Sequence, residues 1–291
     1  MNKLKWSGVN LLFSFIYMIL CFAVESPTEI TEKYTLSKYA ILFGIDFFIL
    51  YMIWFLFILF NKKNVSFVLS DSYKKINYIF GGFSFLIIII KLIFFNYTLF
   101  TARDTYHCLL DINIIFILLS NMVYTTILLH NIRNVNKIYQ QRNTSFYQTT
   151  GICLFLSFSY MMNIFTMKSM SELLNHKVEY MFSDIFSAVN CFIIFLILII
   201  FNVLIKRTSS FYTHQKAIKI FNYNLLGIES FFIAFNIIVN FYVLIIAEYR
   251  GHALLGFLNL FILAWMLVFT IINFYKSTKR QSISNSSSSF I

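Results

Sequence analysis

The sequence predicts an all-α, polytopic membrane helix bundle, and three observations indicate that fold class. The 291 residues are 59% hydrophobic and only 12% charged, whereas an average soluble domain has about 25% charged residues. The hydrophobic residues are gathered in long blocks. Runs such as FLIIIIKLIFF do not alternate as the strands of a membrane barrel do. Because a backbone in hydrocarbon must satisfy its own hydrogen bonds, these blocks are expected to be helices.

Eight apolar segments follow one another along the chain, and most contain about 18 to 22 residues, enough for a helix to cross the bilayer core. No proline interrupts them, because the only proline, Pro27, lies in the first predicted outer loop. We expect one helical bundle over residues 1–275 and a disordered, cytoplasmic, Ser-rich tail over residues 276–291. The segments run roughly Val9–Val24, Ala40–Phe60, Tyr78–Phe95, Leu109–Leu129, Thr149–Met167, Ile185–Ile205, Leu225–Ile246 and Leu254–Tyr275.

Loop charges predict the orientation of the bundle. With the amino terminus inside, about two thirds of the 23 Lys and Arg residues fall in inner segments, and Asp71 is the only acidic residue there. Basic residues accumulate on the cytoplasmic side of membrane proteins, so the carboxyl terminus is expected in the cytoplasm, at the plasma membrane or an endomembrane. The net charge of +11 then faces anionic lipid. The bilayer is therefore the expected partner, and nucleic acid is not.

The first segment fits two descriptions. Lys3 and Lys5 precede a short apolar core, and Cys21 and Ala23 are small residues placed as in a signal-peptidase site. Cleavage after Ala23 leaves seven helices with an outer amino terminus. Retention gives a first helix with Trp6 at the membrane interface, eight helices, and both termini inside. The sequence leaves both interpretations open.

Ionisable residues within apolar segments mark candidate functional sites, because burying them in hydrocarbon is costly. Asp46, Lys91 and Asp111 come from three segments and lie toward the predicted outer ends, so that pairing of Lys91 with Asp46 or with Asp111 is one interpretation. His107 and Asp111 are four residues apart and share a helix face. These four residues form the predicted ligand-binding site. The alternative is that Lys91 reaches the membrane surface by itself and Asp111 is interfacial.

Two polar stripes mark the last two segments. Residues spaced by 7 and 11 positions fall on nearly the same helix face at 100° per residue. The first interpretation is hydrogen bonding that holds the bundle together, and the second is a hydrated path or gate. The stripes are Glu229, Asn236 and Asn240 in one segment, and Asn259, Thr270 and Asn273 in the other.

Motifs that would indicate an enzyme, a metal site or a cofactor are absent from the sequence. There is no HExxH, GxSxG or CxxC, so we expect no enzyme activity, no catalytic residue and no cofactor. His107 and Asp111 alone do not make a metal site, and the placement of the four cysteines implies no disulfide framework. The sequon at Asn96, in a predicted outer loop, predicts a glycoprotein.

The organisation resembles that of seven-helix receptors. It predicts a chemoreceptor-like protein with an outward-facing pocket for a small molecule or lipid, and a cytoplasmic signalling partner at the inner loops Ile132–Gln148 and Lys206–Asn222. The resemblance stops at organisation, because His130–Arg133 reads HNIR where rhodopsin-like receptors have an Asp-Arg-Tyr motif. The alternative is an eight-helix lipid scramblase, or a small transporter or channel, with both termini cytoplasmic.

Overall fold

The structure, a computed structural model, describes residues 2–25, 37–62, 64, 68, 70–101, 104–133, 145–173, 182–207, 215–246 and 250–287. Over these residues the longer elements are all α-helices, and each predicted apolar segment lies within one of them. The predicted all-α membrane bundle is therefore confirmed. The helices are α1 (Asn2–Glu25), α3 (Ser37–Asn61), α5 (Asp71–Thr101), α6 (Thr105–Arg133), α7 (Ser145–Leu173), α8 (Phe182–Arg207), α9 (Gln215–Ile246) and α10 (Arg250–Ser287).

Seven of the described helices are long and apolar enough to cross a membrane, and the apolar stretch of α8, Ile185–Phe201, is shorter. Most helices continue beyond the apolar blocks into polar sequence. The largest differences are at α9, which begins at Gln215, and at α10, which reaches Ser287 instead of ending where the disordered tail was expected. Polar residues outside the hydrocarbon prolong a helix readily when no proline or glycine stops it, so hydropathy marks only the membrane-embedded part of each helix.

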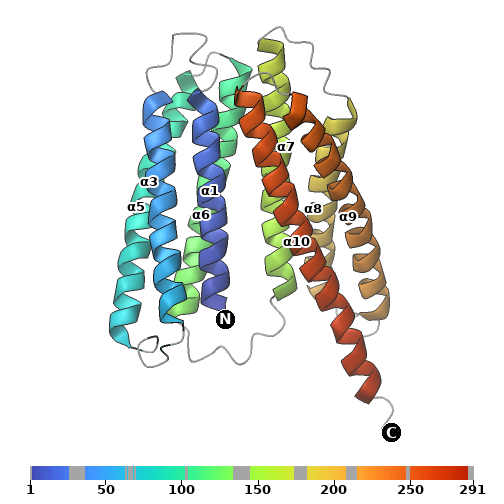
Figure 1. Cartoon of the computed structure of the whole chain (residues 1–291). Helices are drawn as coiled ribbons and strands as arrows, with labels where there is room; N and C mark the ends of the chain where they lie inside the picture. The colour runs from blue at the N-terminus through green and yellow to red at the C-terminus, as the bar shows by residue number, and fades with distance from the viewer. Residues whose placement is uncertain are drawn as a thin grey trace. The chain divides into compact units, whose positions relative to one another are not determined.

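The described helices form two compact units. Unit 1 contains α1, α3, α5 and α6, and unit 2 contains α7, α8, α9 and most of α10. In unit 1, α1 packs against α3 and α6, while α5 packs against α6 and, over a smaller area, α3 (Figure 1). In unit 2, α8 packs against α9, and hydrogen bonds join α7 to both α9 and α10.

Helix α1 is a core element of unit 1. The buried share of its apolar stretch is 72%, against 33% for α3 and 28% for α5. Trp6 and Phe13 both stack on Tyr124 of α6, with ring centroids 5.6 and 5.4 Å away. The Tyr106 hydroxyl of α6 donates to the carbonyl of Ala23, 2.8 Å away, in the last turn of α1. Unit 1 is therefore assembled around α1.

Side-chain caps define where α5 and α6 begin. Ser70 Oγ accepts a hydrogen bond of 3.2 Å from the Tyr73 N–H, and Asp104 Oδ1 accepts one of 2.9 Å from the His107 N–H. Each pair satisfies a backbone donor that has no partner within its helix. The cap at Asp104 also holds the first turn of α6 against the end of α1, where Tyr106 binds.

Gly44 sets the distance between α1 and α3. A Cβ atom at this position would lie 3.0 Å from Cys21 Cβ and 3.1 Å from Met18 Cα, both in α1. Small residues at helix crossings let backbones approach closely, which strengthens van der Waals packing in lipid. Gly82 of α5 is different, because its Cβ position has no neighbouring atom within 4 Å.

These two glycines give a matched test of the α1–α3 contact. Gly44→Ala should destabilise the protein by about 1–3 kcal/mol, because the α1 backbone must move away. Gly82→Ala should be neutral or stabilise by about 0.5–1 kcal/mol, because alanine favours a helix. Thermal unfolding in detergent measures both. Equal effects of the two substitutions would contradict the close approach of α1 and α3.

Candidate functional site

A chain of polar side chains runs through the core of unit 2. At its predicted outer end, Asn240 Nδ2 of α9 donates to the Tyr160 hydroxyl of α7 over 3.0 Å. Asn259 Nδ2 of α10 donates to Asn240 Oδ1, also over 3.0 Å, and lies 3.3 Å from the Met167 sulfur. The polar stripes of α9 and α10 therefore meet at Asn240 and Asn259, and α7 contributes partners to both.

The next hydrogen bonds in this series of polar side chains, one turn further from the predicted outer end, join α9 to α8. Asn236 Nδ2 donates to Ser187 Oγ over 2.8 Å and to the Phe232 carbonyl over 2.9 Å, and it lies 3.7 Å from the Cys191 sulfur. Its backbone carbonyl accepts from Asn240 Nδ2 over 2.9 Å. Asn236 is fully buried, so these contacts replace the water that its amide N–H groups would otherwise bind.

Glu229 lies about 10 Å further along α9, by the rise of 1.5 Å per residue. Its side chain is fully buried. Neither carboxyl oxygen has a hydrogen-bond partner among the described residues, although the Cys191 thiol of α8 lies beside it. Cys153 of α7 is a second neighbour. A buried carboxyl group without a nitrogen or oxygen partner is costly, and within a membrane helix it marks a candidate functional site.

At the predicted inner end of this series of polar side chains, hydrogen bonds join α7 to α10. The Thr149 hydroxyl donates to Asn273 Oδ1, and Asn273 Nδ2 lies 3.4 Å from Thr150 Oγ1. Thr270 is one turn before Asn273 and lies beside Cys153. From Asn259 to Asn273 the chain of polar groups extends about 21 Å along α10, which is most of a hydrocarbon core of about 30 Å. We call this set of side chains the polar column; its members are Thr149, Thr150, Tyr160, Ser187, Glu229, Asn236, Asn240, Asn259, Thr270 and Asn273.

Donors and acceptors in the polar column are not equally satisfied. The side-chain N–H groups of Asn236, Asn240 and Asn259 all have partners. Among the described residues, no hydrogen-bond partner exists for the carboxyl oxygens of Glu229 or for Oδ1 of Asn236 and Asn259. These acceptor oxygens are distributed over about 16 Å of α9 and its neighbour α10. An array of acceptors suits a species that donates hydrogen bonds or carries positive charge.

The four predicted ligand-binding residues lie in unit 1, and two of them, Lys91 and Asp46, pair with one another. Lys91 Nζ of α5 lies 2.6 Å from Asp46 Oδ1 of α3. Lys91 is 2% exposed and Asp46 is 54% exposed, so Lys91 does not extend toward the surface as its alternative interpretation required. Asp111 is buried beside Thr98.

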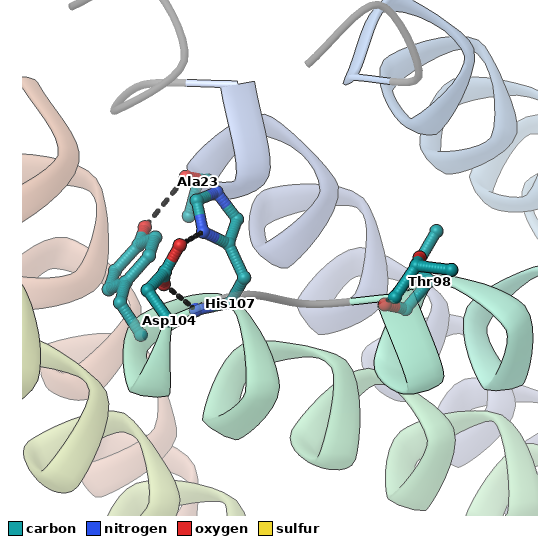
Figure 2. Close-up of polar contacts among 6 residues, drawn as sticks. Ala23, Thr98, Asp104 and His107 are labelled. Carbon is teal, nitrogen blue, oxygen red and sulfur yellow. Dashed lines mark hydrogen bonds and ion pairs between the residues drawn. The ribbon is translucent and has the colours of Figure 1, made fainter. Parts of the chain in front are cut away.

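His107 takes a different partner from the one its spacing suggested. Its Nδ1 lies 2.6 Å from Asp104 Oδ2, and Figure 2 shows the Asp104 carboxylate facing both the ring and the backbone N–H of His107, with Thr98 apart from this pair. The dashed line at Ala23 is the hydrogen bond from Tyr106. Of the four predicted residues, Lys91 thus pairs with Asp46, His107 contacts Asp104, which the sequence did not single out, and Asp111 lies beside Thr98.

Asn96 lies inside α5 instead of in a loop. Its amide nitrogen donates to the Leu92 carbonyl over 2.7 Å, and the helix continues to Thr101. The sequon is therefore part of a regular helix of a candidate membrane span, which differs from the exposed loop that the sequence suggested.

Several residues of these sites carry no sequence signal above the apolar background. Tyr160, Ser187 and Cys191 belong to no motif or helical stripe in the sequence, so only the folded unit identifies them as partners of the α9 stripe. Asp104 is an exception, because an acidic residue directly before a helix and three residues before His107 fits a helix cap.

The described residues contain no group of three or more His, Cys, Asp or Glu side chains placed to hold a metal ion. Comparisons of the chain with models of protein families, with curated protein sequences and with solved structures gave no match. The fold and the apolar helices define a multi-pass integral membrane protein. The buried polar column of unit 2 is its candidate site.

The column predicts opposite stability effects for two of its residues. Glu229→Met should raise stability by about 1 kcal/mol or more, because it removes a buried carboxyl that lacks a partner. Asn240→Leu should lower stability by about 1–3 kcal/mol, because it leaves the amide of Asn259 without its acceptor. Thermal unfolding in detergent distinguishes them. A loss of stability in both variants would mean that Glu229 only holds the helices together.

Proposed function

We propose that the protein is an eight-helix small transporter or channel that moves a monovalent cation, the proton included, through unit 2. The observation that carries this proposal is Glu229, a fully buried carboxyl group whose oxygens lack a hydrogen-bond partner among the described residues. Helix packing alone would be served better by an amide or an apolar side chain. A carboxyl group that binds a passing cation explains why the cost of burial is retained.

Asn236 and Asn259 provide further acceptor oxygens along the proposed ion path. Each keeps its N–H groups bound to neighbouring side chains and leaves its Oδ1 without a partner among the described residues. A cation that enters the column from its predicted outer end therefore meets the acceptor oxygens of Asn259 and Asn236 before it reaches Glu229. Several weak acceptor positions allow an ion to enter and also to leave, which conduction requires.

A scramblase is less well supported than an ion path. The headgroup of a lipid is larger than an ion, and its tails must remain in the hydrocarbon, so a scramblase needs a polar groove that is open to lipid. The side chains of Glu229, Asn236, Asn259 and Asn273 are all completely buried within unit 2. Such enclosure suits a small ion with few water molecules.

The seven-helix receptor is the second interpretation of the sequence, and two observations weigh against it. Removal of the first segment would take away α1, which covers Tyr124 and binds Tyr106 in unit 1. Two residues of the expected ligand pocket, Lys91 and Asp46, also neutralise each other. We therefore propose that α1 is retained, that both termini are cytoplasmic, and that the protein has no catalytic activity.

Glu229→Gln should abolish most of the cation flux. The amide keeps the size of the side chain and removes its negative charge, so it no longer neutralises a bound cation. Purified protein is reconstituted into liposomes, and proton, Na⁺ and K⁺ uptake are measured under a membrane potential. We expect at least a tenfold loss, whereas Asp71→Asn, which removes an exposed carboxylate at the start of α5, should retain the wild-type flux.

Absence of flux for all three ions in the wild-type protein would reject the proposal, and so would full activity of Glu229→Gln.

Retention of α1 predicts the mass of the purified protein. The intact mass should include the first segment, because α1 is the most enclosed helix of unit 1. Amino-terminal sequencing should then find Met1 or Asn2. A chain that begins at Val24 would instead restore the receptor interpretation.

A further inference from the structure

Unit 1 surrounds the ammonium group of Lys91 with a complete set of cation ligands. Nζ donates to Asp46 Oδ1 over 2.6 Å and to the Phe43 carbonyl. The rings of Tyr17, Phe43 and Phe47 also face it, with centroids 5.3, 5.1 and 5.0 Å from Nζ. A carboxylate, a carbonyl and three aromatic rings thus converge on one nitrogen.

This arrangement is the chemistry by which proteins recognise organic ammonium ions. An ammonium ion within about 6 Å of a ring centroid is attracted by the electron-rich face, and desolvation strengthens the attraction. The carboxylate neutralises the charge and accepts an N–H. All of these contacts are made with Nζ, so the aliphatic part of Lys91 acts mainly as a tether.

The walls of the site are held by contacts that do not involve Lys91. The Tyr17 and Phe47 rings pack edge to face, 5.1 Å apart, and Phe47 packs in the same way on Tyr51, 4.9 Å away. Phe43 packs on Phe94 with centroids 5.1 Å apart. We call the rings of Tyr17, Phe43 and Phe47 the aromatic cage. Because each ring packs on another aromatic ring, the cage is expected to persist when the lysine side chain is shortened.

Asp46 gives this cage access to the outside of unit 1. Lys91 is 2% exposed, but the Asp46 side chain is 54% exposed. The carboxylate therefore binds the buried ammonium group with one oxygen and remains accessible from the surface. Because this carboxylate is already partly exposed, we expect a free ammonium ion to bind it in the detergent-solubilised protein without unfolding of unit 1.

We propose that Asp46, the Phe43 carbonyl and the rings of Tyr17, Phe43 and Phe47 form a binding site for a small primary alkylammonium ion, and that Lys91 is its tethered occupant. A tethered group acts at an effective concentration in the millimolar range or above, so Lys91 excludes free amines until it is displaced. This site is separate from the polar column and does not depend on the cation flux proposed above.

The test shortens Lys91 and supplies the missing atoms as a free ligand. Lys91→Ala removes the side chain from Cγ to Nζ, which matches n-propylammonium atom for atom. The midpoint temperature of thermal unfolding of detergent-solubilised Lys91→Ala should rise with added n-propylammonium, by on the order of 5 °C near saturation. The wild type should shift by less than a third of that amount.

Matched controls separate the site from general salt effects. Neutral 1-propanol should not stabilise Lys91→Ala, and n-propylammonium should not stabilise Lys91→Met, whose apolar side chain fills the space. Adding Asp46→Asn to Lys91→Ala should reduce the shift at least threefold. Equal shifts in the wild type and Lys91→Ala, or no shift in Lys91→Ala, would overturn the proposal.

If Lys91→Ala folds poorly, the yield of folded protein provides a second measurement. The variant is then expressed and solubilised with n-propylammonium or with 1-propanol, and the yield of monodisperse protein is compared. Recovery with the ammonium ion alone supports the site. Equal recovery with both additives, or with neither, overturns it.

Discussion

The absence of water from the hydrocarbon core is the constraint on which the rest of the structure depends. A polar side chain there must find a partner inside the protein, and the helices are arranged so that most do. In unit 2 this requirement joins α7, α8, α9 and α10 through Asn236, Asn240 and Asn259. In unit 1 it joins α3 to α5 through Lys91 and Asp46. Polar pairing therefore specifies helix contacts that apolar surfaces alone would not distinguish.

The two units use charge in different ways. Lys91 is enclosed by a carboxylate, a carbonyl and three rings, so its burial is compensated by the protein itself. Glu229 is enclosed just as completely, but its oxygens have no hydrogen-bond partner among the described residues. A compensated charge stabilises a fold, whereas an uncompensated one must be explained by what it binds. This difference is the reason that the proposed ion path lies in unit 2.

Hydropathy was sufficient to predict the fold class and the position of every membrane helix, because both follow from the length of apolar segments. The spacing of Glu229, Asn236 and Asn240 also placed them on one face, since helical geometry fixes that relation. The sequence could not identify Ser187 or Tyr160 as their partners, because contacts between helices depend on rotation and depth. The sequence analysis likewise did not single out Asp104, whose carboxylate contacts the His107 ring.

The contact of α1 with α6 has a consequence for biosynthesis. The ring stacking of Trp6 and Phe13 on Tyr124 needs a residue made about 110–120 positions later, which at about 5–20 residues per second takes roughly 6–24 s. Asn10, which lies between these two residues in the sequence and is fully buried in the structure, would be less completely covered during that interval. Until α6 is inserted, the nascent chain therefore has a first helix that α6 does not yet cover. The rate at which α6 is inserted determines how long that intermediate is open to degradation.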